Sequence, residues 1–158
     1  MAPHKGVNPY LRTQILTASP EELRLMLFDG ALKFCKQARP AIEQGDLEAS
    51  YEALSRAKKI VLELSTGMDR KQAPEVAEKM SALYTFIFKK LVDANMQRDL
   101  APLDEAIGLL EYERETWKML IDKSKGNPDN PAPKLADTQP PTQSPARQTA
   151  LSTYANSA

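Results

Sequence analysis

Residues 8–38 read NPYLRTQILTASPEELRLMLFDGALKFCKQA, and they carry the strongest structural signals of the chain. Its middle, SPEE at positions 19–22, is a strong signal for the start of a helix. The Ser19 hydroxyl can accept a hydrogen bond from an N–H of the first turn, and Glu22 can reach back to the cap. Pro20 falls at the first helical position, where no N–H is needed, and acids suit that end of the helix dipole. We therefore predict a helix from about residue 20 toward residue 42.

This predicted helix is apolar over more than half of its circumference, with Arg24 as an exception inside the apolar arc. Cys35 lies in the same arc, which predicts a small buried hydrophobe rather than a reactive thiol. So wide an arc is typical of a central core helix or of a helix that also serves a partner. Pro40 lies inside the pattern and predicts a kink, or an early end near Ala38.

Three further helices are expected, at about residues 47–65, 74–97 and 101–122. Asp46 is the expected N-cap of the first of these, after a turn at Gly45. Its apolar residues step by three and four, which predicts a bundle face: Leu47, Tyr51, Leu54, Ala57, Val61, Leu64 and Met68. Long helices joined by short turns favour an all-α, antiparallel up-down four-helix bundle.

The chain divides into three parts by composition. We expect a short N-terminal cap segment at residues 1–18 and the bundle domain at residues 19–125. Residues 126–158 hold half of the twelve prolines and are rich in Ser, Thr and Gln. Such a segment cannot bury enough apolar area to offset its ordering entropy, so we expect a disordered tail.

Composition argues against several functional classes. Lys plus Arg and Asp plus Glu are each 21, so no net charge attracts nucleic acid. No apolar run approaches a membrane span, and residues 1–6 lack the apolar stretch of a secretory signal. The single histidine, His4, and the single cysteine cannot build a metal cluster or a nucleophile–base pair. The acids Glu105, Glu111, Glu113 and Glu115 are interpreted as a solvated face. We expect no enzyme, no cofactor and no membrane insertion.

Two blocks of this sequence resemble the FliS-type flagellin export chaperones of bacterial flagella. The first holds Tyr10, Gln14, the run LTASPEEL at 16–23 and LMLFDG at 25–30. The second holds Leu83-Tyr84, KLVDAN at 90–95, Asp99, Leu110 and Trp117. Together they cover about residues 8–121. Phe28 departs from the family, which usually has Tyr there, and the long tail has no counterpart in the family pattern.

The resemblance implies a cytoplasmic chaperone that binds the disordered C-terminal region of flagellin, prevents its premature polymerisation and delivers it to the type III export apparatus. An export-gate component and an anti-sigma factor are implied as further partners, and the N-terminal segment is implied to cover part of the client groove. The expected groove and cap residues are Tyr10, Leu11, Gln14, Ile15, Leu16, Phe28, Tyr84, Ile87, Phe88, Leu91 and Asn95. The residues alone also allow a generic four-helix adaptor for another secreted client or for self-association.

Overall fold

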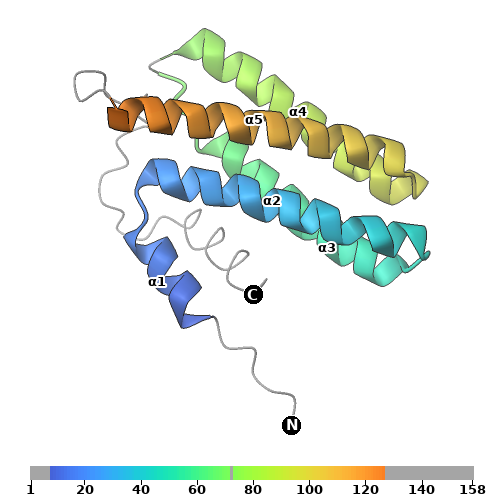
Figure 1. The fold of residues 1–158 in the computed structure, drawn as a ribbon. Helices are drawn as coiled ribbons and strands as arrows, with labels where there is room; N and C mark the ends of the chain where they lie inside the picture. The colour runs from blue at the N-terminus through green and yellow to red at the C-terminus, as the bar shows by residue number, and fades with distance from the viewer. Residues whose placement is uncertain (1–7, 72, 127–158) are drawn as a thin grey trace.

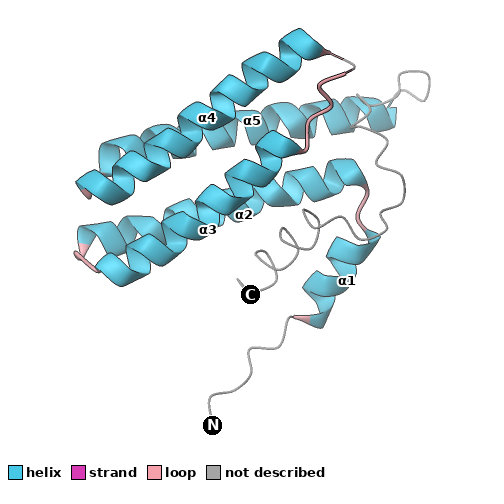
Figure 2. Cartoon of the chain, turned by 180° about the vertical axis from the view of Figure 1, so that it is seen from behind, coloured by secondary structure: helices cyan, strands magenta, loops and turns pink. Residues whose placement is uncertain are grey.

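The computed structural model describes residues 8–71 and 73–126 of the chain. These residues form an all-α structure of five helices without a strand (Figures 1 and 2). The helices are α1 (Pro9–Thr17), α2 (Pro20–Glu43), α3 (Leu47–Thr66), α4 (Pro74–Gln97) and α5 (Leu100–Gly126). The predicted tail, apart from Gly126, lies outside the described residues.

The last four helices form the predicted antiparallel bundle. Helix α2 packs against α3 and α5, and α4 packs against the same two helices, so each helix has two neighbours around a common core. Figure 1 shows the four helices running alternately in opposite directions, while α1 extends from the beginning of α2. The largest fully buried side chains are Tyr84, Phe28, Phe34, Leu54, Ile60, Leu64, Ile87, Leu91, Leu103 and Leu110.

The beginning of α2 has the predicted capping box. The backbone N–H of Glu22 donates to Ser19 Oγ at 3.1 Å, and the backbone N–H of Ser19 donates to Glu22 Oε2 at 3.1 Å. The Ser19 N–H holds the pKa of the exposed Glu22 carboxyl below its usual value. Asp46 caps α3 in a similar way, with the backbone N–H of Ala49 donating to Asp46 Oδ1 at 3.1 Å.

The early end predicted near Ala38 is wrong, because α2 continues through Pro40 to Glu43. Pro40 lies in the last turn, where a missing N–H removes only one intrahelical bond, and its ring is exposed. Its carbonyl still accepts from the backbone N–H of Gln44 at 3.0 Å. The helix therefore tolerates this proline near its C-terminal end.

The N-terminal segment is a helix, which the sequence analysis did not predict. Asn8 caps α1 by accepting from the backbone N–H of Tyr10 at 3.0 Å, and Pro9 occupies the first turn. Asn8-Pro9 is the same kind of start signal as Ser19-Pro20, and it could have been recognised. Ala18 separates α1 from the α2 cap with an extended backbone.

The predicted bundle face of α3 is correct over its C-terminal two thirds and wrong at its beginning. Leu54, Ala57, Val61 and Leu64 are buried in the core, whereas Leu47 and Tyr51 are exposed at 50% and 61%. Both exposed residues continue the three-and-four spacing, so spacing alone could not locate the end of the core. Cys35 is fully buried, as predicted.

Candidate functional site

An open apolar pocket of about 330 Å³ lies at the end of the bundle where α2 begins and α5 approaches its end. The α3–α4 connection and the first half of α4 complete it. Its apolar lining consists of Phe28, Met68, Ala73, Val76, Ala77, Met80, Tyr84, Trp117 and Leu120. Arg24, Asp69, Glu113 and Thr116 are its polar lining residues. A cavity of this size with few polar groups is typical of a binding site for an apolar group.

Arg24 closes the pocket on the side of the core, with only 7% of its surface exposed. Its Nη1 donates to the backbone carbonyl of Leu64 at 3.2 Å, and its Nη2 donates to the Tyr84 hydroxyl at 2.8 Å. The Leu64 carbonyl belongs to the last turn of α3, where the helix dipole favours a cation. The Arg24 side chain therefore joins α2 to α3 and α4 at the base of the pocket.

Three aromatic rings surround the Arg24 guanidinium. Its Cζ lies 5.8 Å from the ring centroid of Phe28, 5.7 Å from that of Tyr84 and 5.4 Å from that of Trp117. Such cation–π contacts compensate part of the lost hydration of a buried cation. Burial raises the pKa of the Tyr84 hydroxyl, with the Arg24 charge acting in the opposite direction. These contacts explain why an arginine occurs inside the apolar arc of α2.

The α4–α5 side of the bundle extends the apolar surface away from the pocket. On α4, Val76, Leu83, Phe86 and Lys90 recur at helical spacing, and on α5 Glu105, Leu109, Tyr112 and Thr116 do the same. The Lys90–Glu105 ion pair, at 3.0 Å, joins the two faces at one end, and the pocket joins them at the other. Val76, Phe86, Tyr112 and Leu120 expose 59%, 44%, 69% and 41% of their surface. We call this surface the α4–α5 face.

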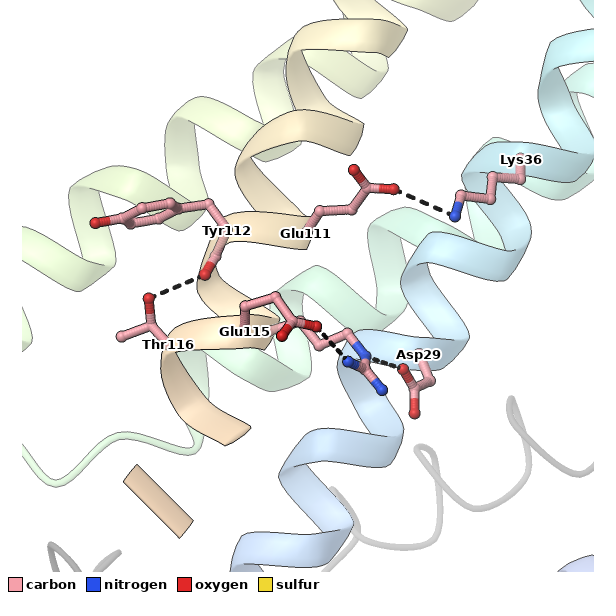
Figure 3. Close-up of polar contacts among 7 residues, drawn as sticks. Asp29, Lys36, Glu111, Tyr112, Glu115 and Thr116 are labelled. Carbon is pink, nitrogen blue, oxygen red and sulfur yellow. Dashed lines mark hydrogen bonds and ion pairs between the residues drawn. The ribbon is translucent and has the colours of Figure 1, made fainter. Parts of the chain in front are cut away.

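The α2–α5 side of the bundle is polar by contrast (Figure 3). Lys36 Nζ pairs with Glu111 Oε1 at 3.2 Å, and Arg114 pairs with Asp29 and with Glu115. Figure 3 shows the Tyr112 ring on the opposite side of α5 from Glu111, pointing away from α2. The side of α5 next to α2 therefore carries several ionic contacts, whereas the side next to α4 carries exposed apolar groups and the Lys90–Glu105 ion pair.

The structure distributes the expected site residues over three places. On α1, Tyr10, Gln14 and Leu16 are exposed, Leu11 is half-buried and Ile15 is buried. Phe28 and Tyr84 line the pocket, although nearly all of their surface is buried. Ile87 and Leu91 lie inside the core, while Phe88 and Asn95 are half-buried on α4. Phe88 lies beside Lys58 of α3, whose Nζ is 5.9 Å from its ring centroid.

Several lining residues were absent from the expected site. Arg24 is an exception in the apolar arc of the sequence, but its partners come from helices 40 to 60 residues away and give no local signal. Val76, Met80 and Leu120 look like ordinary core positions in a helical pattern. The sequence pattern groups Glu113 with three neighbouring acids on a solvated face, whereas the structure places it half-buried at the pocket.

The described part of the chain contains neither a metal-binding cluster nor a membrane-spanning helix. Within residues 8–71 and 73–126, no group of three or more His, Cys, Asp or Glu side chains is arranged to hold a metal ion. None of the helices there combines the length and the apolar character that crossing a membrane requires.

The fold and the pocket define a four-helix-bundle protein with an open apolar pocket at one end. Comparison with known proteins gives the family: the model described as "Flagellar protein FliS" matches residues 3–124. The flagellar secretion chaperone FliS of Salmonella typhimurium is 37% identical over 124 residues, which cover 75% of this chain and 92% of that protein. FliS of Bacillus subtilis is 35% identical over 125 residues, covering 79% and 92%. This chain belongs to the FliS family of flagellar secretion chaperones.

Proposed function

We propose that this protein is a cytoplasmic, non-enzymatic export chaperone that binds the C-terminal region of flagellin. The family membership supports an export role. The observation that carries the more specific proposal is the open apolar pocket and its continuation along the exposed α4–α5 face. A contiguous exposed apolar surface on a small domain is typical of a protein-binding site.

The chemistry of such a complex is folding coupled to binding. A disordered client segment loses conformational entropy when it becomes ordered on the chaperone, at a typical cost of roughly 2–5 kcal/mol. Apolar client side chains offset this cost by leaving water, and a helical segment could lie along the α4–α5 face. While it is bound, the same client surface is unavailable for contacts with other flagellin molecules. Release requires no nucleotide if the export apparatus removes the client.

Helix α1 is the second part of the proposed client site. Tyr10 and Leu16 expose 76% and 60% of their surface, so α1 presents apolar groups that could contact a client or cover the groove. As a movable cover, it would reduce the apparent affinity by the fraction of time that it occupies the site. Amides 10–16 should then exchange quickly in the free protein and change their protection when client binds. Slow exchange in both states would leave α1 as a fixed element.

Delivery to the type III export apparatus completes the proposal, with an export-gate component and an anti-sigma factor as further partners. The proposal is tested by co-expressing this chain with its own flagellin, either full-length or without the C-terminal region. We expect co-purification with the full-length flagellin only. Retention of the truncated flagellin, or loss of both, would contradict the proposal.

A matched pair of variants tests the binding surface. Leu120→Asp places a charge at the edge of the pocket, and Leu62→Asp places one on α3, where Leu62 is 51% exposed. We expect Leu120→Asp to reduce flagellin capture at least tenfold more than Leu62→Asp. Equal effects of the two variants would remove the α4–α5 face from the proposal.

A further inference from the structure

Glu113 differs from the other acids in its part of α5. Glu105 pairs with Lys90 at 3.0 Å, Glu111 pairs with Lys36 at 3.2 Å, and Glu115 pairs with Arg114 at 2.7 Å. For Glu113, no cation of the described residues lies within ion-pair distance. Yet Glu113 is half-buried, whereas Glu105, Glu111 and Glu115 are exposed. The least hydrated carboxylate of the run is therefore the one without an ion pair.

Arg24 is the cation that acts on Glu113 from a longer distance, and it is already engaged. Its two terminal nitrogens donate to the Leu64 carbonyl and to the Tyr84 hydroxyl, and its guanidinium lies among three rings. Burial raises the pKa of the Glu113 carboxyl, and the Arg24 charge offsets only part of this rise. A partly buried carboxylate is stabilised when a cation approaches it, so the Glu113 site would gain from a basic occupant.

Three charged groups line the pocket: Arg24, which is bonded to the Leu64 carbonyl and the Tyr84 hydroxyl, and two acids, Glu113 and Asp69. The Oδ1 of Asp69 accepts from the backbone N–H of Lys71 at 2.8 Å. The apolar walls of the same pocket include the flexible side chains of Met68 and Met80. Long basic side chains lay their methylene groups along apolar walls and keep the charged end at a polar rim. The pocket therefore complements a side chain that is apolar along its stem and positive at its tip.

We propose that this pocket binds a client segment with an apolar side chain and a neighbouring lysine or arginine, and that Glu113 pairs with that basic group. The inference rests on the proposed function and adds a rule for selecting the client segment. An apolar segment without a basic residue would leave Glu113 dehydrated and unpaired. An acidic segment would bring its carboxylate close to Glu113 and Asp69.

Isothermal titration calorimetry, with the C-terminal segment of the protein's own flagellin titrated into the protein, tests this inference. Glu113→Gln keeps the shape of the side chain and removes its charge, and we expect about tenfold weaker binding. Glu113→Asp keeps the charge and should bind more tightly than Glu113→Gln. The matched control is Glu115→Gln, which neutralises an exposed acid on the same helix and should change the affinity less than about twofold. Added salt should weaken the wild-type complex more than the Glu113→Gln complex.

A double-mutant cycle identifies the basic partner. Each lysine and arginine of the flagellin segment is changed singly to Gln and titrated into the wild-type protein and into Glu113→Gln. We expect one of these changes to weaken wild-type binding and to have no further effect in Glu113→Gln.

Unchanged or tighter binding by Glu113→Gln, with the wild type binding normally, would overturn the inference and leave the proposed function intact. The inference would also be overturned if every basic-residue change in the flagellin segment weakened binding equally in the wild type and in Glu113→Gln. Absence of wild-type binding would instead contradict the proposed function itself. Circular dichroism of each variant before titration separates a loss of folding from a loss of binding. If Glu113→Gln does not fold, the affinity of Glu113→Asp is compared with that of the wild type instead.

Discussion

The indole N–H of Trp117, in the C-terminal half of α5, donates to the backbone carbonyl of Glu21 in the first turn of α2 at 3.0 Å. This bond joins two residues 96 positions apart and fixes one wall of the pocket to the helix start that follows α1. Trp117 is the single tryptophan of the chain, so its fluorescence reports directly on this place.

Trp117→Phe should weaken the fold by about 1 kcal/mol, because a typical intramolecular hydrogen bond contributes roughly 0.5–1.5 kcal/mol while much of the ring packing is kept. Urea unfolding followed by circular dichroism measures this change, since the variant lacks the fluorophore. Trp117→Ala, which also removes the ring, should cost clearly more. Equal midpoints for the wild type and Trp117→Phe would show that the bond to Glu21 contributes nothing to stability.

Arg24→Met should destabilise the protein by about 2–4 kcal/mol, although methionine is the more hydrophobic residue. The substitution removes the donors to the Leu64 carbonyl and the Tyr84 hydroxyl, and unpaired buried groups cost about 1–3 kcal/mol each. Arg24→Lys should be only a partial replacement, because an ammonium lacks the planar fork of the guanidinium. The control is Arg70→Met, since Arg70 is exposed and should change stability by less than about 0.5 kcal/mol. Chemical denaturation measures the free energy of unfolding of each variant. An Arg24→Met variant as stable as the wild type would contradict this account.

Ser19→Ala should cost about 1 kcal/mol, within a range of roughly 0.5–2, because it removes one half of the capping box. Client affinity measured well below the melting range should be nearly unchanged. Thr17→Ala is a nearby control, since the Thr17 hydroxyl is exposed and donates to the Thr13 carbonyl within α1. A large loss of affinity with unchanged stability would mean that Ser19 contacts the client.

Cys35 should react slowly with thiol reagents in the native protein. Its side chain is fully buried, and burial raises the pKa of the thiol to about 12, so the reactive thiolate is scarce at neutral pH. In denaturant the same thiol should react at the rate of a free cysteine. Fast native labelling, followed with a chromogenic disulfide reagent, would show that the core around α2 opens readily.

Local signals in the sequence predicted most of the fold. Ser19 and Asp46 begin helices where expected, and the four long helices have nearly the expected bounds. Pro40 did not end α2, because a proline in an exposed last turn costs little. Leu47 and Tyr51 continue the three-and-four spacing of the buried residues of α3, but they are exposed beyond the end of the core. Helix α1 was missed although Asn8-Pro9 gives a start signal.

The candidate site could be predicted only in part. Phe28 and Tyr84 were expected there and do line the pocket, whereas Ile87 and Leu91 are fully buried in the core and are not among its lining residues. Helical spacing shows which residues share a face, but it does not show which of two adjacent faces remains open. The contacts of Arg24, Trp117 and Glu113 depend on how distant helices align, so only the assembled bundle could reveal them.

Photo-crosslinking from the α4–α5 face tests whether the flagellin segment lies on this face. A benzophenone-bearing amino acid replaces Tyr112, which is 69% exposed, and in a second variant it replaces Gln37, an exposed residue of α2. Each variant is irradiated with the C-terminal segment of the protein's own flagellin, and the products are located by mass spectrometry. We predict abundant crosslinks to the segment from position 112 and few from position 37. A complex that forms but crosslinks equally from both positions, or only from position 37, would contradict the claim that this face holds the client.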